Sequence, residues 1–524
     1  MQAFIEVEEQ DMAIPSIAES DRSAHGGASE SSPLLSNNVE AVDALSHRRR
    51  RAILLLYAFA FTMMLGDNLQ PAALIEIFEN LICNAYYKEE MPLKGVLGNR
   101  DCKVKPVQKE LALVRGLQQF VPLIPALLCT VPYGLLAERI GRRRVLILSG
   151  VGVFAALSWV MAVCYWQFVG IRWVLLSGVF LFIGGGDAVT SSLVHIMVTD
   201  ATSQAERAQV FLNLHAADVL SGFFGPAISA PLMEKGYTWS ALLLAQIMLF
   251  TGTFIITYFI PETLELRDKS AQHADSAVDA VSLELHALPT ARSDSLIATL
   301  RHVVRKAYNS LVLFFRAMTS NRQALLLLII FAPQTAAREL FSVIGLQYSG
   351  AKYSLPYARG NVLLSLFQGA QGILVLFLLP AVTRTIADPR GWTAWARDRR
   401  YAVVSIAVTA AGLMTIGLAP GLAVEGLGLL LVALGSCTTG LVMSLLGGAV
   451  RPDQVSTFYS VALTLSMITR SVTGPVLSAL LVKGLELGRE WLGLPFIVMA
   501  ILMMIVTVAS SHISTEKRKD DHEE

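Results

Sequence analysis

The chain has 524 residues and a formal net charge of +1, with 54% hydrophobic and 16% charged residues. Soluble proteins carry about 25% charged residues, so the composition excludes an ordinary soluble domain, gives no sign of a nucleic-acid partner, and indicates a chain surrounded by a lipid bilayer. The five cysteines include no Cys-x-x-Cys pair, which argues against a metal or thiol redox site, and no cofactor is expected.

Residues 1–50 are rich in Ser, Glu and Gly and lack the apolar core of a cleaved signal peptide. We expect a disordered cytoplasmic tail here, with the first hydrophobic span acting as its own signal-anchor. Within the tail, residues 30–35 resemble an acidic dileucine sorting signal, a pattern short enough to arise by chance.

Twelve segments are long enough to cross a bilayer, because a helix needs about 20 apolar residues to span a hydrocarbon core of roughly 30 Å. They are residues 52–78, 111–136, 145–165, 171–198, 208–232, 238–260, 323–348, 360–386, 401–420, 423–448, 455–483 and 491–511. The sequence therefore predicts an all-α membrane protein with twelve transmembrane helices. Two six-helix bundles, 51–261 and 323–511, are joined by a linker at 262–322 and followed by a tail at 512–524.

Basic residues mark one side of the predicted bilayer. Arg48 to Arg51 precede the first span, Arg142 to Arg144 follow the second, and Lys517 to Lys519 lie near the end of the chain. Because cytoplasmic loops carry an excess of Lys and Arg, we expect both termini in the cytoplasm of a plasma-membrane protein, with the vacuolar membrane as the alternative. The end of the linker, residues 295–315, has an apolar face and predicts an interfacial helix, or else a plain linker helix.

The loop 79–110 is the longest on the opposite side of the membrane, and it contains Cys83 and Cys102. External compartments are oxidising enough for disulfides to form. We therefore expect a bridge that staples this loop; two free thiols are the alternative.

The fifth and eleventh spans contain similar segments. When Gly225-Pro226 is set on Gly474-Pro475, "SGFFGPAISAPL" (221–232) aligns with "RSVTGPVLSALL" (470–481). The two spans are six apart and run in the same direction, as expected for parallel repeats related by an axis normal to the membrane. The Gly-Pro pairs also predict close helix packing.

The loop between the second and third spans reads "GLLAERIGRRR" (134–144). It resembles the signature loop of the major facilitator superfamily of transporters, G-x-L-a-D-R-x-G-R-[RK]-[RK], with Glu138 at the position where the family usually has Asp. The segments "ICNAYY" (82–87) and "VQKELALVRG" (107–116) look like a fungal branch of this superfamily that is related to the proton-coupled folate transporter group.

The resemblance implies that this loop is a conformational latch. Glu138 would face the positive N-terminal end of the eleventh helix, an interaction of about 0.3–1 kcal/mol, and Arg142 would pair with Asp200. Glycines would allow tight turning and close helix approach. The alternative is that the arginines only follow the positive-inside rule. The expected latch residues are Gly134, Glu138, Arg139, Gly141, Arg142, Asp200 and Arg207.

Ionisable residues inside the spans cost at least about 2.5–3.5 kcal/mol on insertion scales, so each should face a partner or an aqueous cavity. The family resemblance implies that Asp67, Asp187 and Arg338 face substrate or protons. We expect the two aspartates to couple proton movement, and Arg338 or Arg470 either to hold an anionic substrate or to set the pKa values of the aspartates. The alternative is that such charges only lock helices together. The candidates are Asp67, Arg115, Asp187, Asp218, Arg338, Glu339 and Arg470.

The fifth span carries Ser221, Gly225-Pro226 and Ser229, which resemble the antiporter signature g-x-x-x-G-P-x-x-G-G. Residues 261–264, "PETL", echo a sugar-porter ending without its last two residues. The resemblance implies a proton-coupled carrier that exports a small organic compound, such as a secondary metabolite, toxin or xenobiotic, and works as a monomer in the bilayer. The alternatives are a proton-coupled importer of an organic anion and a non-transporting membrane sensor. An intramembrane enzyme is not expected, because no cluster such as His-Glu-x-x-His occurs.

Overall fold

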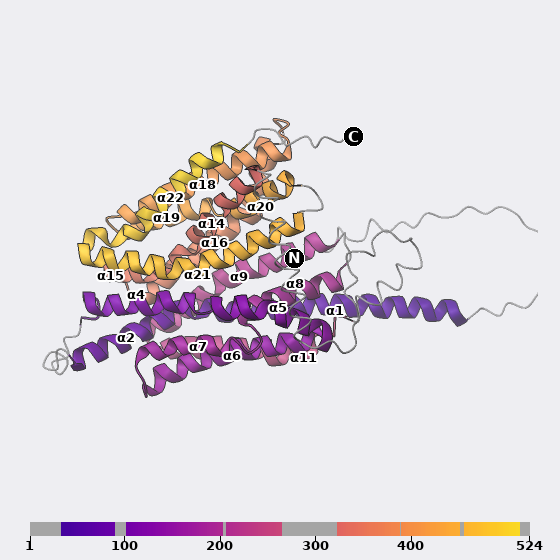
Figure 1. Cartoon of the computed structure of the whole chain (residues 1–524), viewed down its shortest axis with the longest axis horizontal. Coiled ribbons are helices and arrows are strands. Elements are labelled where there is room, and N and C mark those ends of the chain that lie inside the picture. Colours follow the sequence, from indigo (N-terminus) through magenta and orange to yellow (C-terminus); the bar gives the residue numbers. More distant parts are fainter. Residues whose placement is uncertain are drawn as a thin grey trace, which may run out of the picture. The chain divides into compact units, whose positions relative to one another are not determined.

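The structure is a computed structural model that describes residues 33–89, 101–202, 206–264, 322–387, 389–450 and 455–513. Every regular element in these ranges is helical (Figure 1). The packing described below is that of residues 48–524, which form one unit, with residues 1–47 forming another. The start of the predicted dileucine signal, the predicted interfacial helix of the linker and the tail beyond residue 513 lie outside the described residues.

The first half of the chain forms six helical spans, several of which are built from two or three consecutive helices. They are α1 (Pro33–Leu69) with α2 (Pro71–Glu89), α4 (Lys105–Phe120) with α5 (Leu123–Ile140), α6 (Arg142–Trp166), η2 (Ile171–Leu176) with α7 (Ser177–Phe180) and α8 (Gly186–Ala201), α9 (Arg207–Glu234), and α10 (Thr238–Phe250) with η3 (Thr251–Ile256) and α11 (Thr257–Phe259).

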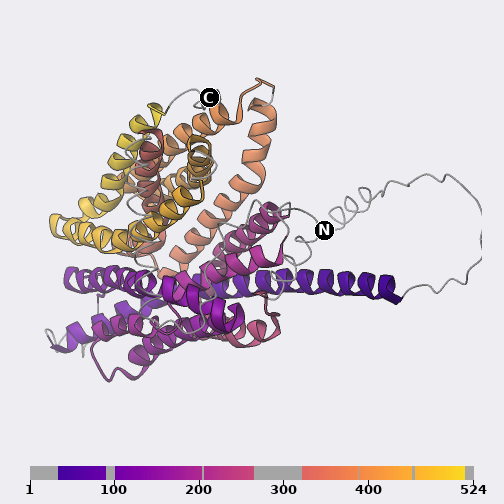
Figure 2. The ribbon, with the colours of Figure 1, turned by 45° about the vertical axis from the view of Figure 1, so that its right-hand side comes forward.

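The second half forms six further spans. They are α14 (Arg322–Leu340) with η4 (Phe341–Gly345) and α15 (Leu346–Tyr353), α16 (Tyr357–Ile373) with η5 (Leu374–Leu378), α17 (Leu379–Val382) and η6 (Thr383–Ala387), α18 (Ala394–Leu418), α19 (Leu422–Leu434) with α20 (Thr438–Ala449), α21 (Val455–Leu487), and η7 (Arg489–Gly493) with α22 (Leu494–Ser511). Figure 2 shows the two halves, indigo to magenta and orange to yellow, as two bundles.

Ten of these spans are long and apolar enough by themselves to cross a membrane. The remaining two, residues 171–201 and 357–387, lie at the expected positions of the fourth and eighth spans and complete the set of twelve. The predicted all-α membrane fold is therefore confirmed.

Helix α1 begins much earlier than the sequence analysis expected. It starts at Pro33, so residues 33–50 are helical and do not belong to a disordered tail. No Gly or Pro occurs between Leu34 and Leu65, and the polar part of this stretch is rich in residues that tolerate a helix, so nothing in the chain ends the helix before the first span begins.

The fourth span is interrupted at three consecutive glycines. Gly184, Gly185 and Gly186 all have positive φ values, between 64° and 83°, which L-residues with a side chain rarely adopt. A Cβ atom on Gly184 would lie 2.3 Å from the backbone of Ser149 in α6. The glycines therefore allow the chain to turn against α6 and to start α8 at mid-span, which places Asp187 in the first turn of that helix.

The two halves meet along two equivalent helix pairs, α9 with α16 and α4 with α21. In the second pair the backbones touch: a Cβ on Gly116 would lie 3.2 Å from the carbonyl oxygen of Gly474, and a Cβ on Gly474 would lie 3.1 Å from that of Gly116. The first pair consists of spans five and eight, and the second of spans eleven and two. Span five corresponds to span eleven in the other half, and span eight corresponds to span two, so exchanging the halves converts one pair into the other. This arrangement matches the parallel repeat predicted from the Gly-Pro segments.

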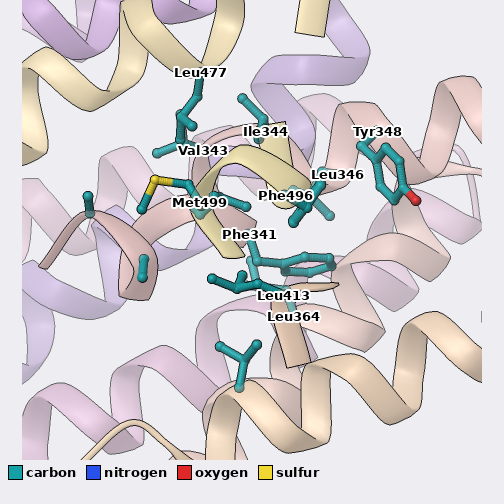
Figure 3. Close-up of a cluster of buried hydrophobic side chains, with 14 of the residues drawn as sticks. Phe341, Val343, Ile344, Leu346, Tyr348, Leu364, Leu413, Leu477, Phe496 and Met499 are labelled. Atoms are coloured by element: carbon teal, nitrogen blue, oxygen red, sulfur yellow. The ribbon is translucent and has the colours of Figure 1, made fainter. Parts of the chain in front are cut away.

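Buried apolar side chains form two clusters that differ in which halves they join. The larger cluster includes Phe78 of α2 and Leu111 of α4 together with Tyr348 and Phe496 of the second half, part of which Figure 3 shows. The smaller cluster draws its described residues from the first half alone. The halves thus share a core near the Cys83–Cys102 loop, here called the disulfide end, and in the described part have no common core near Arg142, here called the Arg142 end.

Candidate functional site

A cavity of about 880 Å³ lies between the two halves. It is lined from the first half by α1, α4, α8 and α9, and from the second half by α14, α16, α20 and α21. All seven ionisable residues singled out in the spans line it, together with one histidine. Its charged and titratable lining residues are Asp67, Arg115, Asp187, His215, Asp218, Arg338, Glu339 and Arg470.

Four of these charges form pairs. Nη2 of Arg470 in α21 lies 3.3 Å from a carboxylate oxygen of Glu339 in α14, within the second half. Nη2 of Arg338 lies 4.0 Å from a carboxylate oxygen of Asp218 in α9, across the two halves. Nδ1 of His215 lies 3.9 Å from the same Asp218 oxygen, one turn away on the same helix. The cavity therefore contains one ion pair that joins the bundles and one that does not.

The remaining three charges belong to the first half. Asp67 lies near the break between α1 and α2 and accepts a hydrogen bond from the side chain of Gln70 at 3.4 Å. Asp187 lies in the first turn of α8. Arg115 in α4 donates from Nη1 to Gln118 at 3.0 Å. Among the described residues, none of these three charges has an ion-pair partner within 4 Å.

A buried polar cluster closes the disulfide end. The carboxylate of Glu79 in α2 accepts hydrogen bonds from Lys103 Nζ at 2.8 and 2.9 Å, from Tyr357 Oη at 2.8 Å and from the side-chain amide of Gln108. Lys103 also donates to Tyr357 Oη at 3.2 Å. Gln347 donates to the backbone carbonyl of Gln108 at 2.8 Å. Because Tyr357 and Gln347 belong to the second half, the cluster (Glu79, Lys103, Gln108, Gln347 and Tyr357), here called the closure cluster, joins the bundles.

A disulfide between Cys83 and Cys102 lies beside this cluster. Cys83 follows Glu79 by one turn of α2, and Cys102 immediately precedes Lys103. The bridge therefore ties together the two chain segments that carry the acid and the base of the buried ion pair. The cluster beneath the bridge was not predicted from the sequence.

The latch residues lie at the Arg142 end. Arg142 is buried, and its Nε lies 3.4 Å from Asp200, at the end of the fourth span, while its Nη2 lies 3.9 Å from Glu138. Glu262, which follows the sixth span, accepts hydrogen bonds from the backbone N–H groups of Arg142 at 2.9 Å and Arg143 at 3.2 Å. This carboxylate caps the start of α6, where the helix dipole favours negative charge. Glu262 was not among the predicted site residues, although the "PETL" segment was its signal.

The remaining latch residues have different surroundings. Gly141 has φ +100°, and a Cβ there would contact the carboxylate of Glu262, so this glycine allows both the turn and the cap. A Cβ on Gly134 would meet no atom within 4 Å, so the close helix approach expected there is not made in this conformation. Arg139 is exposed. Arg207 is the first residue of α9, and its side chain lies outside the described part of the structure.

The Gly-Pro segments pack in the way their small residues suggest. A Cβ on Gly225 would contact the side chain and backbone of Asn68 in α1. One turn further along α9, the side-chain amide of Asn361 in α16 donates to the hydroxyl of Ser229, and also to the carbonyl of Pro226 at 3.2 Å. The sequence resembling an antiporter signature therefore lies at the α9–α16 contact between the halves.

Two equivalent six-helix bundles around a charged cavity, closed at one end, define a membrane transporter. Residues 111–472 match the family model of the Major Facilitator Superfamily. The chain is 28% identical over 496 residues to the "MFS efflux pump atnC" of Emericella nidulans, covering 91% of each chain. It is 27% identical over 442 residues to the "Efflux pump ustT" of Aspergillus flavus, covering 83% of each.

Solved transporters share the fold. A POT family transporter in complex with a thioalcohol-conjugated peptide has a TM-score of 0.55 at 13% identity, over 87% of this chain and 95% of that one. The nucleoside transporter NupG has a TM-score of 0.57 at 11% identity, over 88% and 99%. The chain belongs to the Major Facilitator Superfamily, as the loop at 134–144 predicted. Its relation to the proton-coupled folate transporter group stays a prediction.

Proposed function

We propose that this protein is a proton-coupled efflux transporter that moves a small organic compound out of the cytoplasm by alternating access. The observation that carries the proposal is the charged cavity between the two bundles, with a closure cluster at one end and no shared core at the other in the described residues. Relatives that span more than four fifths of the chain are named efflux pumps of fungi. The cargo is accordingly a fungal secondary metabolite, a toxin or a xenobiotic.

The positive-inside rule sets the orientation of this transporter. The Arg142 end, with its run of arginines, faces the cytoplasm, and the disulfide end faces outside, where the Cys83–Cys102 bridge is stable. Both termini are then cytoplasmic. The described conformation is the inward-facing one. The protein works as a monomer and is located in the plasma membrane. The alternative location is the vacuolar membrane.

Asp67 and Asp187 are the proton-coupling groups in this proposal. A carboxylate in a cavity with little water can bind and release protons during the transport cycle. Both aspartates are exposed to the cavity and have no cation within ion-pair distance among the described residues. Protonation changes their net charge, which changes their affinity for a charged cargo.

The Arg142 end acts as the latch of the outward-facing conformation. Glu138 is about half exposed here and pairs weakly with Arg142, so it is free to face the N-terminal end of α21 when the bundles close at this end. The favourable interaction of a carboxylate with a helix N-terminus, about 0.3–1 kcal/mol, then stabilises the outward-facing state. Asp200 and Glu262 hold the start of α6 in place for that contact.

The test uses everted vesicles from cells that express the full chain, with candidate fluorescent cargos added to the outer medium. Efflux predicts cargo uptake into these vesicles that collapses when a protonophore is added. Asp67→Asn and Asp187→Asn should abolish the dependence on the proton gradient. The matched control Glu486→Gln removes an exposed carboxylate outside the cavity and should transport normally. Uptake that ignores the protonophore would remove proton coupling from the proposal.

The second candidate is a proton-coupled importer of an organic anion. The two arginines of the second half, Arg338 and Arg470, favour it, because both reach the cavity. The direction of cargo movement in the same vesicles separates the two functions: an importer moves cargo out of everted vesicles when protons flow outward.

A further inference from the structure

Some charges of the cavity have an ion-pair partner among the described residues, and the others all lie on the first bundle. Arg470 is paired with Glu339, and Arg338 lies near Asp218. After these pairs are set aside, Asp67, Asp187 and Arg115 remain, all on the first bundle, and no described residue offers any of them an opposite charge within 4 Å. These three groups keep hydrogen-bonding atoms that no described residue uses, so they are the ones that a ligand would complete.

Arg115 is the clearest case of a cavity charge with too few hydrogen-bond partners. The residue is 6% exposed and lines the cavity, yet among the described residues its guanidinium donates only one hydrogen bond, from Nη1 to Gln118. Its buried Nε has no hydrogen-bond partner in the described part of the chain. A guanidinium presents five N–H donors in a planar fork that matches a carboxylate or phosphate. The unused donors of Arg115 therefore fit an acidic group of a ligand.

Asp67 and Asp187 form the complementary site. Both line the cavity, from α1 and α8, and two carboxylates that face one space favour a cation between them. Arg470 lines the same cavity, but its guanidinium lies 3.3 Å from Glu339 and not within ion-pair distance of either aspartate. The unused acceptors of the two aspartates fit an ammonium group of a ligand.

We propose that the cavity binds an amphoteric compound, with its ammonium group at Asp67 and Asp187 and its acidic group at Arg115. The proposal rests on the proposed function in one respect, that this cavity is the transport site. A volume of about 880 Å³ suits a ligand of drug size. The first bundle holds both charged ends of the compound, and the second bundle, whose own charges are paired, covers its body.

The test compares four forms of the dipeptide phenylalanyl-alanine, which differ only at their ends: free, N-acetylated, C-amidated, and blocked at both ends. Binding to the full chain in lipid nanodiscs is measured by titration calorimetry without any ion gradient. The free dipeptide should bind at least tenfold more tightly than either singly blocked form, and the doubly blocked form should bind weakest. Equal affinity for the four forms, or no binding of any, would overturn the proposal.

Two substitutions assign the ends of the dipeptide. Arg115→Gln should lower the affinity for the free form to that of the amide and leave the amide itself within twofold. Asp187→Asn should lower the affinity for the free form to that of the N-acetylated form, and should leave the affinity for the N-acetylated form itself within twofold. Lys109→Gln, a matched loss of a positive charge at the exposed disulfide end, should leave the ranking unchanged. If Arg115→Gln weakened all four forms equally, Arg115 would not be the acid-binding group.

The outcomes keep this inference separate from the function. Binding in nanodiscs involves no transport and no gradient, so the ranking of the four dipeptides stands even if the vesicle assay finds import or no proton coupling. Conversely, protonophore-sensitive efflux of a cargo that carries neither an amine nor an acid would overturn the ligand class and leave the proposed function intact.

Discussion

Replacing Tyr357 by Phe should loosen the closure cluster at the disulfide end. The hydroxyl of Tyr357 donates to Glu79 at 2.8 Å and accepts from Lys103 at 3.2 Å, and it is buried in the contact between the bundles. A hydrogen bond to a charged group contributes about 1.5–3 kcal/mol, and about 1.4 kcal/mol corresponds to a factor of ten. The conformation closed at this end should therefore lose a factor of about 10–100 relative to the one open there.

A native thiol reports this change. Cys437 is free and lines the cavity, whereas the other free cysteines, Cys129 and Cys164, are buried and can be replaced by Ala. A membrane-impermeant maleimide applied from the disulfide side reaches Cys437 only when that end is open. While the open state is rare, the labelling rate is proportional to its population. Tyr357→Phe should thus raise the labelling rate about 10–100-fold.

The control is an exposed ion pair between the same two bundles. Lys109 Nζ and Glu486 lie 2.8 Å apart between α4 and α21, with 38% and 43% of their side chains exposed. Exposed pairs contribute about 0–1 kcal/mol, so Lys109→Gln should change the labelling rate by less than about fivefold. The reasoning would be refuted if the two variants had equal effects, or if Tyr357→Phe labelled at the wild-type rate.

Three further outcomes are expected. Glu262→Ala removes the cap of α6 and should lower stability by about 0.5–2 kcal/mol; an unchanged melting temperature would mean that the cap contributes nothing. Gly184→Ala forces a side chain into a backbone contact at φ +82° and should clearly lower the melting temperature. Gly134→Ala adds a methyl group to open space and should leave the melting temperature unchanged. Similar melting temperatures for the two variants would contradict this account. The double variant Cys83→Ser, Cys102→Ser should speed maleimide labelling of Cys437 from the disulfide side, because Lys103 is then no longer held covalently near Glu79. Slower labelling would contradict this role of the disulfide.

The positions of the spans could be predicted because hydropathy over about 20 residues is a local property of the chain. The limits of α1 could not be predicted in the same way. The polar segment before the first span contains no helix-ending residue between Leu34 and Leu65, but polar composition was interpreted as disorder. A scan for Gly and Pro would have extended this helix. The break at Gly184–Gly186, in contrast, has a local signal, because three glycines in a row lower helix propensity wherever they occur.

The charged cavity could be predicted from single residues, since any ionisable group at mid-span needs a polar environment. The closure cluster could not. Glu79 lies one residue beyond the predicted end of the first span, so it was counted as part of a loop, and glutamines such as Gln108 and Gln347 give no charge signal at all. Tyr357 lies 278 residues from Glu79 along the chain, and no local pattern in one sequence connects residues so far apart.

The Cys83–Cys102 bridge has a consequence for the energy of the transport cycle. Lys103 and Glu79 lie on the same bundle and are held near each other covalently, so they should travel together when the bundles part. Within the closure cluster, opening then breaks only the hydrogen bonds that Tyr357 and Gln347 make, and neither charge is left without its counter-ion. The cluster therefore adds no cost of separating a buried acid from its base to the cost of parting the shared apolar core.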